Sequence, residues 1–456
     1  MSIEKMTPFE RRAAYTLASI FGLRMLGLFM ILPVFALYAE HLGGVTPTLV
    51  GVAIGAYGLS QSILGIPLGI VSDRIGRKPV IITGLLIFAA GSAVAAVSTT
   101  IYGVIAGRAI QGAGAIAAVV MALLADLTRE EQRTKAMAVI GMTIGLSFMV
   151  AMVGGPLLNH WVGVPGIFWL TALFALLAIP VVQFLIPTPA THRLHRDTEP
   201  VLSQFGTVLR DGQLMRLNLG ILSLHMGLTA TFTALPLVLR ESGFAPAHHW
   251  ELYLPVMVLG MATAVPFIII AEKQRMLKQI FVGAVALMAL SESGLLLFYS
   301  HFDAIVVAVG AYFIAFNLLE ATLPSLVAKF APAEGKGTAM GIYSSSQFIG
   351  AFLGGWAGGA FHEAYGFGGV FGFATVVLFV WLLVAASMRQ PRYLASQLLY
   401  VGVMDLPRAR HTEMAIAGVR GVAEVTIEAA EGVAYLKVDS HALDRDALEQ
   451  FCAQRP

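Results

Sequence analysis

The side chains best suited to chemistry in this sequence are ionisable groups that lie inside long apolar stretches. Glu320 and Asn317 lie three positions apart and so share one face of a helix, and His225 lies in another stretch. A carboxyl or imidazole group in apolar surroundings can bind and release a proton near neutral pH. Glu320 is our first candidate for a proton carrier and His225 the second, although either could be a buried structural group. Glu292, in a third stretch, is expected to belong to a structural pair.

A second set of polar residues in apolar stretches comes from the first half of the chain. Because charge inside a membrane is costly, Arg24 and Arg108 should face protein or water rather than lipid. Arg24 could hold an anionic group or pair with an acid. With Gln61, Gln111 and Asn317 it forms our set of candidates for the lining of a substrate cavity. Arg108 could alternatively be a structural anchor that bonds to backbone carbonyls.

A short charged segment, residues 69–78 with the sequence GIVSDRIGRK, lies between two apolar runs of membrane length. Such a segment marks a tight loop at a membrane face. Gly69 and Asp73 share one helix face. We expect the missing side chain of Gly69 to let another helix approach, so that Asp73 could meet the positive N-terminus of that helix. Gly76 permits a positive φ in the turn. The candidate gating residues are Gly69, Asp73, Arg74, Gly76, Arg77 and Lys78, with Asp126 as the expected partner of Arg77.

Another apolar stretch holds the glycines Gly145, Gly154 and Gly155, followed by Pro156. Proline removes a backbone hydrogen bond, so a kink is expected there. The glycines could allow close packing against another helix, or they could be ordinary packing residues.

Composition indicates a protein that crosses a membrane many times. The chain has 456 residues, of which 57% are hydrophobic and 12% charged, and the charged share is about half that of a soluble protein. The single cysteine, Cys452, excludes an intramolecular disulfide and a CxxC metal site. The sequence has no Walker A motif, HExxH motif or clustered nucleophile. We therefore expect no enzyme, cofactor, metal site or nucleic-acid partner.

Hydropathy predicts twelve transmembrane helices in an all-α membrane domain. The predicted spans are 13–39, 47–71, 79–98, 101–126, 134–158, 166–186, 214–239, 251–271, 279–300, 303–327, 338–361 and 368–388. Lys and Arg concentrate in the even-numbered loops and the tails, whereas the odd-numbered loops hold only Arg240. This bias predicts that both termini are cytosolic.

The chain divides into four expected parts. Residues 1–188 and 214–390 are two six-helix bundles, residues 189–213 are a cytosolic linker with a possible interfacial helix, and residues 391–456 are a small cytosolic α+β domain. In this last part we expect strands at 398–404, 422–428 and 433–439 and helices at 408–417 and 443–451. The order βαββα is similar to a ferredoxin-like, heavy-metal-associated domain, but its metal-binding CxxC is absent.

Three motifs carry a resemblance to a known family. The loop pattern G-x-x-x-D-R-x-G-R-K, the run from Arg108 to Ala115 and the Gly155-Pro156 pair resemble signatures of the major facilitator superfamily, in its drug:proton antiporter branch. The resemblance implies the family's fold of two bundles, alternating access and a central site lined by the seventh and tenth spans. It also implies a role for Arg108 in proton movement. The first span has no Asp or Glu, unlike several drug exporters, which puts proton coupling through the first half in doubt.

The function expected from these observations is proton-coupled efflux of a small amphipathic organic compound across a bacterial inner membrane by a monomer. Its partners would be the lipid bilayer, the small-molecule substrate and protons. Two alternatives stay open. One is uptake or facilitated diffusion of a small metabolite, and the other is a transport-dead sensor that signals through the C-terminal domain.

Overall fold

The first half of the chain folds into a group of long helices. The structure, a computed structural model, describes residues 6–187, 204–332, 335–391, 395–429, 432–439 and 442–453. The helices of this half are α1 (Pro8–Phe29), α2 (Leu32–Ala39), α3 (Pro47–Ile75), α4 (Arg77–Val97), α5 (Ile101–Ala113), α6 (Ala117–Asp126) and α7 (Glu130–Pro180), and a short π-helix (Val181–Leu185) continues α7.

The second half repeats this plan. It comprises α8 (Phe205–Arg210), α9 (Gly212–Glu241), the 3-10 turn η3 (Pro246–His248), α10 (His249–Lys273), α11 (Leu277–Phe298), α12 (Phe302–Phe330) and α13 (Lys336–Ala386). Helix α8 lies in the region where the sequence predicts an interfacial helix, while residues 189–203 of the predicted linker lie outside the described residues.

Ten helical segments of the described chain are long and apolar enough to cross a membrane. Two of them are each 51 residues long, which is about twice the length that one crossing needs: Lys135–Leu185, from α7 and its π-helical extension, and Lys336–Ala386, which is α13. Each is broken by one glycine with positive φ, Gly163 at 65° and Gly366 at 66°. Each of the two therefore crosses twice, and the twelve predicted crossings are confirmed.

Two of the predicted spans are interrupted, which the sequence analysis did not anticipate. The first crossing breaks at Met30 and Ile31, between α1 and α2, and the fourth breaks between Ala113 and Ala117. At the second break the carbonyl of Gly114 accepts a hydrogen bond from Arg24 Nη2 at 2.9 Å. The same carbonyl accepts the backbone N–H of Ile116 at 2.9 Å, so its two lone pairs are shared between the chain and the arginine.

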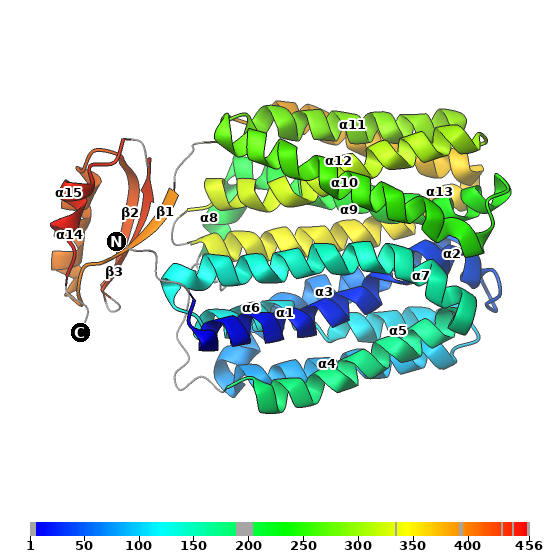
Figure 1. The fold of residues 1–456 in the computed structure, drawn as a ribbon, viewed down its shortest axis with the longest axis horizontal. Helices are drawn as coiled ribbons and strands as arrows, with labels where there is room; N and C mark the ends of the chain where they lie inside the picture. Colours follow the sequence, from blue (N-terminus) through cyan, green and yellow to red (C-terminus); the bar gives the residue numbers. More distant parts are fainter. Residues whose placement is uncertain are drawn as a thin grey trace.

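The helices form two side-by-side groups, one from each half, that run parallel to the long axis of the molecule (Figure 1). Helices α1, α3, α4, α5 and α7 pack with one another, as do α9 to α13. The two groups meet mainly where α3 lies against α13 and where α7 lies against α10. Large apolar side chains such as Trp161 and Phe184, both 82% exposed, lie on the outside, as expected for a surface in contact with lipid.

A small α+β unit follows at one end of the helices. Its elements are β1 (Ala395–Tyr400), α14 (Leu406–Ala417), β2 (Val422–Glu428), β3 (Val433–Val438) and α15 (Arg445–Glu449), in an antiparallel sheet of order β1-β3-β2. The order βαββα is as predicted, although β1 begins and ends a few residues earlier than expected. One face of the sheet packs on α14 and α15 through Ala434, Leu436 and Val438.

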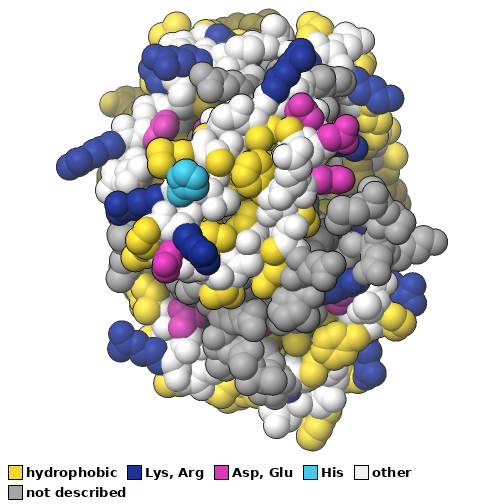
Figure 2. Space-filling model, turned by 90° about the vertical axis from the view of Figure 1, so that its left-hand side faces the viewer, with side chains coloured by type: hydrophobic (Ala, Val, Ile, Leu, Met, Phe, Trp, Pro, Cys, Tyr) yellow, Lys and Arg dark blue, Asp and Glu magenta, His cyan; other side chains and the backbone are white. Residues whose placement is uncertain are grey.

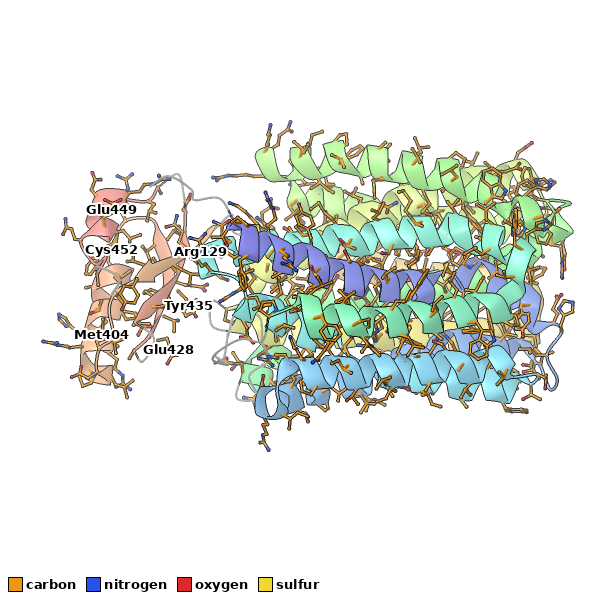
Figure 3. The ribbon with its side chains drawn as sticks, turned by 60° about the horizontal axis from the view of Figure 1, so that its bottom comes forward. Arg129, Met404, Glu428, Tyr435, Glu449 and Cys452 are labelled. Atoms are coloured by element: carbon orange, nitrogen blue, oxygen red, sulfur yellow. The ribbon has the colours of Figure 1, made fainter. Side chains whose placement is uncertain are left out.

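The other face of β3 lies toward the transmembrane helices. Figure 3 shows Tyr435, from β3, and Arg129, just before α7, at the boundary between this unit and the bundle, with Cys452 on the far side. Lys437 is only 5% exposed, and its ammonium donates to the carbonyls of Ala331 and, at 3.3 Å, of Lys329 at the end of α12. Burial lowers the pKa of Lys437. The outer surface of this end mixes basic, acidic and apolar side chains (Figure 2).

Candidate functional site

The charged loop between α3 and α4 is organised around a buried arginine. The Arg77 side chain is 2% exposed and forms ion pairs with Asp73 and, through Nε at 3.2 Å, with Asp126 Oδ2 at the end of α6. Its Nη1 also donates to Ser72 Oγ at 2.7 Å. Gly76, with φ of 98°, forms the junction between α3 and α4. The loop therefore fastens the ends of three helices of the first half to one another.

The remaining residues of the loop motif are less constrained. Arg74 is exposed, and Lys78 Nζ donates to the carbonyl of Gln183 at 3.4 Å. A Cβ atom on Gly69 would meet only Ala118 of α6, at an ordinary 3.5 Å, among the residues that the structure describes. The expected close approach of a second helix at Gly69 is therefore absent from this conformation.

The polar residues of the first half meet in one cluster. Arg24 Nη2 donates to Gln61 Oε1 at 2.8 Å, and Arg108 Nη1 donates to Gln111 Oε1 at 3.0 Å. Both guanidinium groups lie near the ring of Tyr57, with centroid distances of 5.7 Å for Arg24 and 5.3 Å for Arg108. Four of the predicted residues are thus brought together.

The predicted proton carriers of the second half meet through a residue that the sequence analysis missed. Gln347 of α13 donates from its amide nitrogen to His225 Nε2 at 2.8 Å and to Glu320 Oε1 at 3.4 Å. An amide nitrogen cannot accept, so His225 Nε2 is the acceptor. The proton of a neutral imidazole then lies on Nδ1, which is 3.3 Å from the carbonyl of Ile221. This orientation of the Gln347 amide fits a neutral His225.

One carboxylate oxygen of Glu320, Oε2, could accept a further hydrogen bond. This oxygen lies 3.9 Å from His225 Nε2 and has no hydrogen-bond partner among the described residues. The side chain is 37% exposed, ten residues before the end of α12, although its Oε2 atom is itself buried. Asn317 does not join it, because the Asn317 amide bonds to the carbonyl of Phe313 at 2.8 Å.

A second buried acid lies apart from this cluster. Glu292 of α11 is fully buried, and its Oε1 lies 2.5 Å from the hydroxyl of Thr231 on α9. The same hydroxyl is 2.8 Å from the carbonyl of Gly227. A hydroxyl has one hydrogen, so both contacts are satisfied together when the Thr231 hydroxyl donates to the Gly227 carbonyl and accepts from a protonated Glu292. Glu292 and Thr231 thus form a buried side-chain pair between α11 and α9.

The two halves are joined at the end away from the chain termini. Glu40, after α2, forms a two-bond ion pair with Arg240 of α9, and the backbone nitrogen of Thr48 donates to Glu363 at 3.2 Å. A Cβ atom on Gly51 of α3 would lie 1.8 Å from the carbonyl oxygen of Gly355 on α13. None of these contacts was predicted from the sequence.

The predicted glycine packing in α7 holds at one position only. A Cβ atom on Gly155 would lie 2.4 Å from the carbonyl of Met30, so α1 and α7 approach closely there. Gly145 and Gly154 have open space at the corresponding position in this conformation, so close packing at these two glycines stays a prediction. The helix continues through Pro156 and breaks only at Gly163.

The fold, with its two helical groups and a charged α3–α4 loop, can be compared with known proteins. A sequence profile of the Major Facilitator Superfamily matches residues 17–276 and 274–398. The chain belongs to this superfamily of secondary membrane transporters.

Particular relatives extend the match. The chain is 46% identical over 454 residues to the inner membrane transport protein YajR of Escherichia coli (strain K12), and the alignment covers 100% of both chains. It is 26% identical over 345 residues to the multidrug resistance protein MdtH of Yersinia enterocolitica serotype O:8 / biotype 1B, covering 74% of this chain and 84% of the relative.

The fold is also that of solved transporters. A bacterial homolog of the human lysosomal transporter Spinster, crystallised in an inward-facing and occupied conformation, matches 83% of this chain and 97% of its own with a TM-score of 0.68 and 12% identity. At that identity the likeness shows the shared fold.

Proposed function

We propose that this transporter exports a small amphipathic organic compound in exchange for protons, by alternating access in a bacterial inner membrane. The observation that carries the proposal is the cluster of Glu320, His225 and Gln347, contributed by α12, α9 and α13. A proton arriving on His225 Nε2 would break its bond with Gln347, and a proton on Glu320 would remove the charge that faces both partners. Either event changes the contacts between three helices.

The names of the relatives support the setting of this proposal. One relative is named an inner membrane transport protein and another a multidrug resistance protein. The concentration of Lys and Arg in the tails and even-numbered loops supports cytosolic termini. With that orientation, the Glu40–Arg240 contact lies at the periplasmic end, and the charged α3–α4 loop lies at the cytosolic end.

The proposed role of the α3–α4 loop is to hold the cytosolic ends of the two halves together in the other conformation. Gly51 faces Gly355 and Gly58 faces Phe348, so a shift of seven positions along α3 matches a shift of seven positions back along α13. If the same register continues for eleven more residues beyond Gly58 and Phe348, Gly69 lies opposite Gly337 at the start of α13. Asp73 would then lie close to the positive end of that helix.

Transport assays in proteoliposomes test the proposal. A panel of amphipathic compounds is offered under an imposed pH gradient, and both compound and proton flux are followed. Glu320→Gln should abolish pH-driven flux while compound binding persists, because the amide keeps the shape but cannot exchange a proton. Glu292→Gln is the matched control and should keep coupled flux.

The same assay separates the alternatives. Unchanged coupled flux in Glu320→Gln contradicts the assigned proton carrier. Flux of compound and protons in the same direction indicates uptake by symport rather than export. A wild-type protein that moves neither compound nor protons contradicts transport and favours the sensor.

A further inference from the structure

Two arginines of the first half are buried without any acidic partner among the described residues. The exposed fractions are 2% for Arg24 and 3% for Arg108. All their described hydrogen bonds end on neutral oxygens. Arg24 bonds to Gln61 and to the carbonyl of Gly114, and Arg108 bonds to Gln111 and to the carbonyls of Ala53 and Ile54 on α3. Among the described residues, only neutral groups stabilise these two positive charges inside the membrane domain. Burial of a charge without an opposite charge costs free energy.

Arg24 retains unused donors. Its Nη2 makes both described bonds, while Nε and Nη1 are buried and have no hydrogen-bond partner among the described residues. A guanidinium group carries five N–H hydrogens, so three of them are unpaired here. Each nitrogen of Arg108, by contrast, already has a described partner. Arg24 is thus the group free to bind, and Arg108 adds positive charge beside it.

Aromatic rings surround these charges. Arg24 lies 5.3 Å from the ring centroid of Phe88, and both guanidinium groups lie within 6 Å of the Tyr57 ring. Tyr57 in turn lies 6.1 Å from the ring of Phe348 on α13, in the other half of the molecule. The cluster is therefore directly behind the contact between the two halves. Phe348 contacts the cluster through the Tyr57 ring, and separation of α3 from α13 would withdraw Phe348 from Tyr57.

We propose that Arg24 and Arg108 form the recognition site for the transported compound, and that this compound is an organic anion. Its anionic group, such as a carboxylate, binds the free N–H groups of Arg24 in the field of both arginines. Its apolar or aromatic body packs on Tyr57, Phe88 and Phe348. This inference rests on the proposed transport function, because it names the class of substrate.

The test compares probes that differ only in charge. Benzoate and 2-naphthoate are offered to the purified full-length protein, beside the corresponding neutral amides and the corresponding methylammonium compounds, and binding is measured by calorimetry. The wild type should bind the carboxylates at least tenfold more tightly than the amides or cations. Arg24→Gln should lose this preference, while Arg24→Lys, which keeps the charge, should retain part of it.

Several results would overturn the assignment. These are failure of the wild type to bind either carboxylate, a preference for the cations, or equal binding of carboxylates by Arg24→Gln. The wild-type comparison decides between charge classes even if Arg24→Gln does not fold. Arg445→Gln, an exposed change on α15, should bind the carboxylates as the wild type does. Carboxylate binding is measured without a pH gradient and proton coupling is measured by flux, so either proposal can fail alone.

Discussion

Glu40 and Arg240, 200 residues apart in the chain, meet face to face across the two halves, with Nη1–Oε2 and Nη2–Oε1 distances of 2.5 and 2.8 Å. They lie in different halves, so this contact can exist only while that end of the transporter is closed. Both side chains are about 40% exposed, 39% for Arg240 and 43% for Glu40. Solvent screening limits such a pair to about 0–1 kcal/mol.

Glu40→Gln should therefore shift the conformational equilibrium modestly toward opening of this end, by up to about fivefold, as expected from 1 kcal/mol. The hydrogen bond with Arg240 lowers the pKa of Glu40. The stabilisation is therefore fully present above the ordinary pKa of a glutamate and is lost as the pH falls through the lowered value. Distances between spin labels across this end, measured against pH and salt, check the prediction.

The matched control for that change is Glu241→Gln, which removes the same charge next to Arg240. Glu241 forms no ion pair in the part of the chain that the structure describes. An equal shift in both variants would mean that net charge, rather than the pair, sets the equilibrium.

Lys437→Met should loosen the C-terminal α+β unit from the bundle without unfolding either. The ammonium bonds to the end of α12, where the helix carries partial negative charge, a contact worth about 0.3–2 kcal/mol. Cys452 is the single cysteine and is exposed, so it can carry a spin label without other changes. The label should become more mobile in Lys437→Met and stay unchanged in Arg445→Gln, which alters an exposed charge on α15. Equal mobility in all three proteins would contradict docking through Lys437.

Thr231→Val should lower thermal stability, because it leaves the buried carboxyl group of Glu292 without the hydroxyl that it contacts. An unsatisfied buried polar group costs about 1–3 kcal/mol. Glu292→Gln should cost less, since an amide can donate to Thr231 as the neutral acid does. Thr229→Val is the matched control, because the Thr229 hydroxyl bonds only to backbone carbonyls of its own helix. Melting curves of the purified variants give the ranking, and a Glu292→Gln protein less stable than Thr231→Val would mean that Glu292 is charged.

Hydropathy was sufficient to predict the membrane crossings, because each crossing is a long apolar segment. Local charge was sufficient to predict that Arg77 lies near Asp126, because both residues lie at helix ends on one membrane face. The order of strands and helices in the α+β unit was also predictable from the sequence. The contact between Glu40 and Arg240 could not be predicted, since each is a charged residue at the end of a helix and nothing in the sequence pairs one with the other. Gln347 was missed because one sequence does not show which side of α13 faces α9 and α12. The break at Gly114 was also hidden, because it depends on a tertiary bond from Arg24.

Asp73→Asn should favour the present conformation. Here Asp73 pairs with Arg77, and in the other conformation the register of α3 on α13 would bring it to the N-terminus of α13. That contact would add about 0.3–2 kcal/mol to closure of this end. Labels on the ends of α3 and α13 should therefore report a larger open fraction in Asp73→Asn than in the wild type. Arg74→Gln, an exposed change in the same loop, should have little effect. An unchanged distance distribution with intact transport would show that the segment is only a charged loop.

The register of α3 on α13 also predicts that one substitution, glycine to alanine, has opposite effects at the two ends of α3. A Cβ atom on Gly51 would lie 1.8 Å from a backbone carbonyl oxygen of Gly355, so Gly51→Ala should force this end apart. At Gly69 a Cβ atom has room now, but it would obstruct the approach of α13 in the other conformation. Gly69→Ala should therefore hold the protein in the conformation described here.

Because both changes replace glycine by alanine inside the same helix, each gains about 1 kcal/mol of helix propensity, and that term cancels in the comparison. Gly141→Ala, in α7 with nothing within 4 Å, controls for it. Label pairs at both ends of the α3–α13 contact should move in opposite directions in the two variants and stay as in the wild type in Gly141→Ala. If Gly51→Ala and Gly69→Ala shifted the distances in the same direction, α3 would not rock against α13 about the middle of their contact.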